Sequence, residues 1–275
     1  MKELTLQELQ RKSLDILSDV HDFCVRHDIK YSLAYGSLIG AVRHKGFIPW
    51  DDDVDIIMPR PDYERFIATF SAPERGLIRE SDKESYIIFS RVFDTKDTIC
   101  RTMNPFARKY KGGVWIDVFP LDGVSDNFEE FSNAIQSLRV LWKKQIRYRY
   151  AKASIKDILH TFPLKDILIL FAIKFTCTAE WFIKKTNQKM RQIGGSIPYG
   201  TTQHWSQMTV IDDSTRNYQI LDDFRETIDL PFEDKVFKSL IGYDRYLTNI
   251  YGDYMQLPPE EDRKPKQQRT KFFWK

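Results

Sequence analysis

Apolar side chains recur every three or four positions between Thr5 and Asp28, which is the spacing of one face of an α-helix. Thr5 and Glu8 form a capping-box pattern that favours a helix start at this point. Residues 29–35 then alternate between apolar and polar side chains, as half-buried strands do. The pattern therefore predicts an amphipathic helix, followed by a strand that leads to a turn at Gly36.

Runs rich in β-branched and aromatic residues predict further strands later in the chain. One run covers residues 53–57, and another covers residues 114–119 and stops at Pro120. Two shorter runs, 86–89 and 92–93, predict further strand at those residues. Because these runs alternate with helical patterns, we expect an α/β (α+β) fold built on a mixed sheet.

Acidic residues gather where the run 53–57 begins. Asp53 and Asp55 are expected on one face of the strand with Val54 buried opposite, because side chains alternate along a strand. The same alternation puts Asp51 on the face of Asp53, as a further metal ligand or an acceptor beside the ligands. By the same alternation, Asp52 is expected to point to the other face of the strand and to have a structural role. Paired carboxylates suit Mg²⁺ or Mn²⁺, so we expect a metal-bound nucleotide or diphosphate as ligand.

Small and basic residues precede this acidic stretch. Gly36 lets the backbone approach a phosphate group closely, and Ser37 offers a hydroxyl group and an amide donor. Arg43, His44 and Lys45 in isolation would indicate an exposed basic turn. Their place between the Gly-Ser turn and the carboxylates favours neutralisation of a departing phosphate, for which the forked guanidinium of Arg43 is suited.

Asp117 stands alone in the apolar run 114–119. An ionised carboxylate in such a strand is costly unless it is paired, protonated or bound to a metal ion. The run leaves two interpretations open. Asp117 is either hydrogen-bonded to a neighbouring arginine or lysine, or part of a functional site.

Three segments together resemble the LicD family of phosphotransferases, which has a nucleotidyltransferase fold and includes phosphocholine transferases. The segments are residues 31–63, residues 113–123 (GVWIDVFPLDG) and residues 243–259 (YDRYLTNIYGDYMQLPP). The resemblance implies a nucleotidyltransferase-like mixed-sheet core with an added helical region. It also implies that Asp117 completes the metal site begun by Asp53 and Asp55.

The implied reaction is transfer of a phospho-alcohol group from a CDP-alcohol donor such as CDP-choline to a glycan or glycolipid hydroxyl, with release of CMP. Asp117 would also accept the proton of the attacking hydroxyl. The expected site residues are Asp53, Asp55 and Asp117 for catalysis and for Mg²⁺ or Mn²⁺, and Gly36, Ser37, Arg43, His44, Lys45 and Asp51 for the substrate. Two alternatives are a nucleotidyltransferase that releases pyrophosphate and a catalytically silent binding module.

Positive charge is concentrated between residues 138 and 191. This segment has thirteen lysines and arginines against three acidic residues, whereas the whole chain has a net charge of +3. It is interleaved with aromatic residues, and its most apolar part, Leu164 to Phe175, is too short and too charged to span a bilayer. The segment is either an ordinary helical region with a solvated basic face or a surface that rests on an anionic membrane. Nucleic-acid binding is disfavoured, because no motif for it is present.

These features predict residues 1–130 as a catalytic core, 131–198 as a basic, aromatic helical region, and 199–275 as a C-terminal region packing on the core. The three cysteines are odd in number and far apart, and the N-terminus carries no secretory signal pattern, so we expect a cytoplasmic protein at the inner face of the membrane. Residues 263–271 are basic and predict an exposed tail. The tyrosines of the last block fit either a core or a cleft.

Overall fold

The computed structural model describes residues 1–82, 87–102, 112–151, 155–161, 164–175, 179–209, 215–265 and 270–275. Its helices within these ranges are α1 (Leu6–Arg26), α2 (Tyr35–Ile39), α3 (Arg60–Thr69), α4 (Phe128–Ala151), α5 (Ile155–Thr161), α6 (Leu164–Phe175), α7 (Ala179–Gly194) and α8 (Tyr243–Tyr251). A π-helical turn (Gly40–His44) continues α2, and short 3₁₀ turns occur at Thr215–Asn217, Leu221–Phe224 and Glu260–Asp262. The strands are β1 (Ser32–Leu33), β2 (Asp55–Pro59), β3 (Arg75–Ile78), β4 (Ser90–Asp94), β5 (Thr98–Thr102), β6 (Trp115–Val124), β7 (His204–Ser206), β8 (Gln219–Ile220), β9 (Thr227–Phe232), β10 (Lys235–Leu240) and β11 (Thr270–Trp274).

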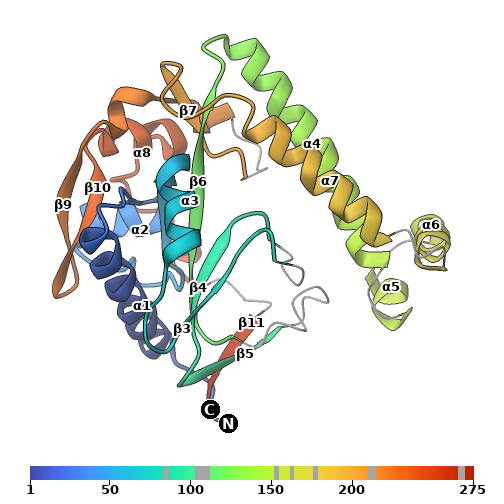
Figure 1. Cartoon of the computed structure of the whole chain (residues 1–275). Coiled ribbons are helices and arrows are strands. Elements are labelled where there is room, and N and C mark those ends of the chain that lie inside the picture. The colour runs from blue at the N-terminus through green and yellow to red at the C-terminus, as the bar shows by residue number, and fades with distance from the viewer. Residues whose placement is uncertain are drawn as a thin grey trace.

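A mixed sheet forms the centre of the molecule, with the strand order β1-β2-β6-β4-β3 (Figure 1). Strands β2 and β6 run parallel, whereas β4 is antiparallel to β6 and β1 is antiparallel to β2. The C-terminal part of β6, past the residues that pair with β4, pairs with β7, and β7 pairs in turn with β8. The expected α+β class with a mixed sheet is confirmed.

Helix α1 covers this sheet with an apolar face. Ile16, Leu17 and Val20 are fully buried and belong to the same core cluster as Ile56 and Val118 of the two parallel strands. The predicted capping box at the start of the helix is present, because the Thr5 hydroxyl accepts from the Glu8 amide and the Glu8 carboxylate accepts from the Thr5 amide. The helix predicted from the apolar spacing is confirmed.

The strand predictions need three corrections. The strand expected over residues 29–35 is reduced to Ser32–Leu33. The second correction concerns the strand predicted from the runs 86–89 and 92–93. Strand β4 occupies Ser90–Asp94, whereas Ile87–Phe89 are not strand and Tyr86 lies outside the described residues. The third concerns β6, which continues past Pro120. This proline lies beyond Val118, the last residue of β6 that pairs with β4, where a missing amide donor is tolerated.

The two chain ends lie together against the core. Strand β11 pairs with β5, and the Leu4 amide donates to the Phe272 carbonyl oxygen. The basic tail predicted over residues 263–271 is corrected at Thr270 and Lys271, which belong to strand β11 next to the buried Phe272, although Lys271 is exposed as predicted. Residues 266–269 of that predicted tail lie outside the described residues.

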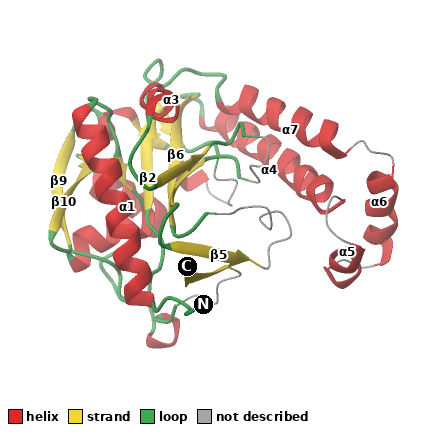
Figure 2. Cartoon of the chain, turned by 60° about the horizontal axis from the view of Figure 1, so that its bottom comes forward, coloured by secondary structure: helices red, strands yellow, loops and turns green. Residues whose placement is uncertain are grey.

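Helices α4 and α7 pack side by side and extend away from the sheet, with α5 and α6 at the far end (Figures 1 and 2). We call Phe128–Gly194 the helical arm. Its root shares a buried apolar cluster with Val124 and Met208, and its tip has a separate small cluster that includes Ile158 and Leu170. Among the described residues, no helix is long and apolar enough to cross a membrane.

Two of the cysteines are placed by the structure. Cys24 and Cys100 are buried free thiols, and burial raises the pKa of each above its usual range. Cys177 lies outside the described residues.

Candidate active site

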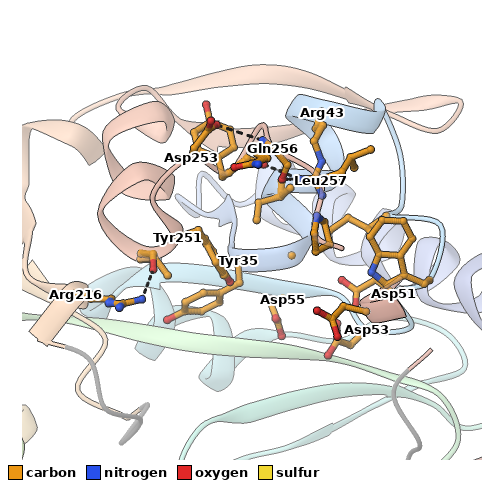
Figure 3. A pocket seen from close by; sticks show the side chains of 18 of the residues that line it. Tyr35, Arg43, Asp51, Asp53, Asp55, Arg216, Tyr251, Asp253, Gln256 and Leu257 are labelled. Carbon is orange, nitrogen blue, oxygen red and sulfur yellow. Dashed lines mark hydrogen bonds between the residues drawn. The ribbon is translucent and has the colours of Figure 1, made fainter. Parts of the chain in front are cut away.

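A cavity of about 1110 Å³ opens where α2, the acidic loop before β2 and the C-terminal part of the chain meet. The acidic and basic side chains on its wall are Arg43, Asp51, Asp53, Asp55, Arg216, Asp253, Asp262 and Lys264. In Figure 3, Asp51 and Asp53 lie together toward one end of the cavity, Tyr35 and Tyr251 lie toward the other end, and Asp55 lies between them. Four of the residues predicted from the acidic stretch and the Gly-Ser turn, Gly36, Asp51, Asp53 and Asp55, are thus brought to one cavity.

The Gly-Ser turn forms the first turn of α2 and supports the carboxylates from behind. A Cβ atom at position 36 would lie 2.5 Å from Oδ2 of Asp51, so glycine is what lets this carboxylate reach the turn. The hydroxyl oxygen of Ser37 accepts a hydrogen bond of 2.9 Å from the Asp55 amide, and Ser37 is only 4% exposed. In the structure Gly36 lines the cavity, whereas Ser37 is buried and fixes the start of β2.

The acidic residues before β2 lie in an irregular loop instead of an extended strand. The Asp51 amide donates to the Ile48 carbonyl oxygen at 2.9 Å, and regular strand begins only at Asp55. Carboxylate oxygens of Asp51, Asp52 and Asp53 consequently lie within 4.8 Å of one another. The prediction that Asp52 turns away from Asp51 is wrong, because alternation of side chains requires an extended backbone.

Asp117 lies between a carboxylate and a guanidinium group on the neighbouring strands. It is in register with Asp55 on β2 and with Arg91 on β4. Arg91 donates from Nε to Oδ1 of Asp117 at 2.5 Å and from Nη2 to Oδ2 at 3.2 Å, while its guanidinium lies 4.3 Å from the centre of the Trp115 ring. The arginine partner expected for Asp117 is therefore Arg91, and this pairing is compatible with a place for Asp117 in a functional site.

Asp117 is not among the described residues that line the large cavity. Asp117 lines a smaller cavity of about 200 Å³, together with Asp52, Asp53 and Arg91. Asp53 lines both cavities, so it lies next to the carboxylates of the large cavity and to those of the smaller one.

Burial and mutual repulsion shape the ionisation of these groups. Burial raises the pKa of Asp55 well above its usual range, and the nearby Asp53, Asp117 and Asp51 raise it further. Burial also raises the pKa of Asp117, against the opposing effect of Arg91. A divalent cation would relieve this repulsion, and an all-carboxylate set of oxygen donors fits Mg²⁺ or Mn²⁺.

The three basic residues after the Gly-Ser turn separate in the structure. Arg43 lines the cavity, and its Nη1 donates to the carbonyl oxygens of Tyr254 at 2.6 Å and Gln256 at 3.2 Å. Its Nε donates to Nε2 of His44 at 3.0 Å, which makes His44 a support for Arg43. Lys45 is exposed and its Nζ donates to the Val42 carbonyl oxygen at 3.1 Å, outside the cavity wall that the described residues form.

Several cavity residues escaped the sequence analysis. Arg216 and Lys264 carry no local pattern that marks them, because they reach the cavity only through the tertiary fold. Tyr251 belongs to the last resembling block and is 45% exposed, and partial desolvation together with the nearby Asp55, Asp51 and Asp53 raises its pKa above the usual range. Of the tyrosines in that block, Tyr246 is buried in the core, Tyr254 is buried in the same core and also lines the cavity, and Tyr251 lines the cavity.

Comparisons with known proteins extend along nearly the whole chain. A family model described as LicD/FKTN/FKRP, nucleotidyltransferase domain, matches residues 28–168. The lipopolysaccharide cholinephosphotransferase LicD of Haemophilus influenzae is 34% identical over 273 residues, which cover 96% of this chain and 97% of that protein. An uncharacterized protein of Rickettsia typhi is 42% identical over 57 residues, which cover 20% of this chain and 18% of that protein. Another, from Rickettsia prowazekii, is 49% identical over 41 residues, 15% of either chain.

Proposed function

The chain belongs to the LicD family, and from this membership we propose that it is a phosphotransferase that attaches phosphocholine to a hydroxyl group of lipopolysaccharide or a related glycan. The likeness along nearly the whole length supports this assignment more strongly than any single motif does. The family resemblance noticed in three segments of the sequence is confirmed.

We assign CDP-choline, or a similar CDP-alcohol, as the donor. One observation carries this assignment: Asp51, Asp53 and Asp55 line the same large cavity as Arg43, so diphosphate-binding chemistry is available beside space for a nucleotide. The acceptor oxygen would attack the phosphorus atom that carries choline. A new phosphorus–oxygen bond forms as the bond to the CMP oxygen breaks, and CMP leaves.

The carboxylates have two tasks in this proposal. Asp53, Asp55 and Asp117, with Asp51 beside them, would hold Mg²⁺ or Mn²⁺, which when bound neutralises charge on the donor diphosphate. The proton of the acceptor hydroxyl passes to Asp117 or to its in-register partner Asp55. Arg91 holds both oxygens of Asp117, so this fork fixes the orientation of the carboxylate.

Aromatic residues on the cavity wall would receive the choline group. Trp50, Tyr35 and Tyr251 line the cavity, and each aromatic face that meets a quaternary ammonium contributes about 0.5–1 kcal/mol or more. We place the reaction at the inner face of the membrane, where a lipid-linked glycan precursor would present its hydroxyl group.

The test is the identity of the released product. Purified protein is incubated with Mg²⁺ and an acceptor glycan, in parallel with CDP-choline, CDP-ethanolamine and CTP, and CMP and pyrophosphate are measured separately. We expect CMP from a CDP-alcohol and loss of that release in Asp53→Asn. Pyrophosphate from CTP without any turnover of a CDP-alcohol would overturn the proposal in favour of nucleotidyl transfer.

A further inference from the structure

The tip of the helical arm exposes an apolar surface that the rest of the fold leaves uncovered. Helix α6 buries Ile167 and Leu170 against the small cluster at the tip. The adjoining face of the same helix carries Leu164, Leu168 and Phe175, which are 75%, 67% and 72% exposed. Because these three residues are spaced by four and seven positions, they share one side of the helix.

The neighbouring helices at the tip of the arm also carry exposed apolar side chains. Ile155 and Leu159 of α5 are exposed and four residues apart, so they too share one face of their helix. Trp181, at the start of α7, is 56% exposed, and Nζ of Lys185 lies 4.6 Å from the centre of its ring. Single exposed apolar residues are common on proteins, but a group of this kind marks an interaction site. We define Ile155, Leu159, Leu164, Leu168, Phe175 and Trp181 as the tip surface.

Positive charge around the tip surface indicates which kind of partner it fits. Lys143, Lys144, Lys156 and Lys185 are all exposed on the helices that surround it. A second copy of this chain would bring an equally basic arm against the first, which like-charge repulsion opposes. A bilayer with anionic lipids instead supplies both an apolar interior for the leucines and negative headgroups for the lysines.

We propose that the tip surface docks the protein on an anionic lipid bilayer. Helix α6 lies in the plane of the interface with Leu164, Leu168 and Phe175 inserted among the acyl chains, and Trp181 sits at headgroup level. The 24 residues of α4 span about 36 Å, so the arm holds the core away from the lipid surface. This inference rests on the arm and stands whether or not the proposed donor is correct.

Binding to vesicles tests the proposal. The full-length protein is sedimented with vesicles made of equal parts phosphatidylcholine and phosphatidylglycerol, at near-physiological salt. We expect Leu168→Glu and Phe175→Glu each to weaken binding by about tenfold or more, because each removes one inserted apolar side chain. The matched control is Val25→Glu on α1, which places the same charge at a helix residue that is 56% exposed and leaves binding unchanged.

A second pair of measurements separates charge from insertion. Lys184→Gln combined with Lys185→Gln should weaken binding to the mixed vesicles and have little effect on pure phosphatidylcholine. Release of CMP from CDP-choline with a soluble acceptor, and the melting temperature, should be unchanged in every tip variant, so loss of docking is distinguished from loss of catalysis or folding.

Three results would overturn docking on lipid. One is failure of the unmodified protein to sediment with the mixed vesicles. Another is binding by Leu168→Glu and Phe175→Glu as tight as that of the unmodified protein. The third is a lipid-free dimer, seen by analytical ultracentrifugation, that both tip variants dissociate while vesicle binding stays the same, since the occupant would then be a second copy.

Discussion

At the scale of single residues, the ionisation of Asp55 links stability to pH. Its pKa is raised by burial first and by the surrounding carboxylates next, so the folded protein without metal disfavours the charged form. The corresponding contribution to stability is fully present below the ordinary aspartate pKa of about 3.9 and is lost as the pH rises through the raised value.

Asp55→Asn should therefore melt at a higher temperature than the unmodified protein at pH 8 when no metal is present. The gain should shrink as the pH falls toward the ordinary aspartate pKa, because the carboxyl group becomes protonated first in the folded and then in the unfolded state. Each kcal/mol gained raises the melting temperature by about 2–4 °C in a chain of this size. Calorimetry with a chelator measures the effect, and an equal or lower melting temperature at pH 8 would contradict it. Turnover should be abolished in the same variant.

Gly36 gives a second prediction at this scale. In Gly36→Ala the new methyl group would meet Oδ2 of Asp51 at 2.5 Å, and the flexible carboxylate would have to move away from the turn. We expect the fold to persist and the Mg²⁺ concentration for half-maximal turnover to rise by about tenfold, equivalent to roughly 1.4 kcal/mol. Metal titrations of Gly36→Ala, Asp51→Ala and the double variant check the cause. If displacement of Asp51 is the cause, Gly36→Ala adds almost nothing once Asp51 has been removed.

At the scale of elements, the turn of the β9–β10 hairpin braces the loop that leads to the acidic residues. The Glu233 amide donates to the Lys45 carbonyl oxygen at 2.7 Å, and its side chain accepts from the Phe47 amide at 2.9 Å. A Cβ atom at Gly46 would meet the same carboxylate at 2.2 Å, so the contact is close. The hairpin therefore holds the loop in place from outside the cavity.

Glu233→Ala should loosen this loop while leaving the cavity residues unchanged. Loss of the acceptor for the Phe47 amide should lower the free energy of unfolding by about 0.5–1.5 kcal/mol, because the Glu233 side chain is exposed to water, and turnover should need more donor. Urea denaturation and donor titration measure the two effects. The control is Asp234→Ala, which removes a neighbouring exposed carboxylate. Equal behaviour of the two variants would show that the brace is unimportant.

Local pattern predicted those parts of the molecule that local physics determines. The helix with its capping box, the burial of Val54 and the strand around Asp117 follow from spacing and composition over a few residues. The orientation of Asp52 could not be predicted, because it depends on a loop conformation braced by a distant hairpin. Neither could the pairing of Ser37 with the Asp55 amide, since the same hydroxyl could equally have faced a phosphate group.

At the scale of the whole molecule, the C-terminal strand closes the fold behind the carboxylates. Phe272 of β11 is buried, its ring centre lies 4.8 Å from that of Trp115, and it lines the smaller cavity with Asp53 and Asp117. The end of the chain thus forms part of the support of the site. The sequence did not predict this role for β11, because the basic residues before Phe272 predicted an exposed tail.

Phe272→Ala should lower the free energy of unfolding by about 3–5 kcal/mol, the usual cost of removing a buried phenylalanine side chain. The matched control is Phe273→Ala, since Phe273 is half-buried on the other face of β11, against Arg101. Phe273→Ala should lower the free energy of unfolding by clearly less than Phe272→Ala does. Chemical denaturation of both variants decides the matter, and equal destabilisation would mean that the burial of Phe272 beside the smaller cavity contributes no more than the packing of Phe273.

The pairing of Val124 with His204 has a consequence for how this architecture can change. Those two residues stand opposite each other in an antiparallel ladder, so everything between them is topologically one very long hairpin loop of about 80 residues. Replacing most of that excursion by a short turn would lower the entropy cost of closing the loop by about 2–3 kcal/mol without shifting any strand register. The ladder therefore permits changes in the part of the arm beyond its root, whereas the root itself packs in the buried cluster with Val124 and Met208. The length and the tip of the arm can be changed to suit a different surface while the strands that carry Asp55 and Asp117 keep their places.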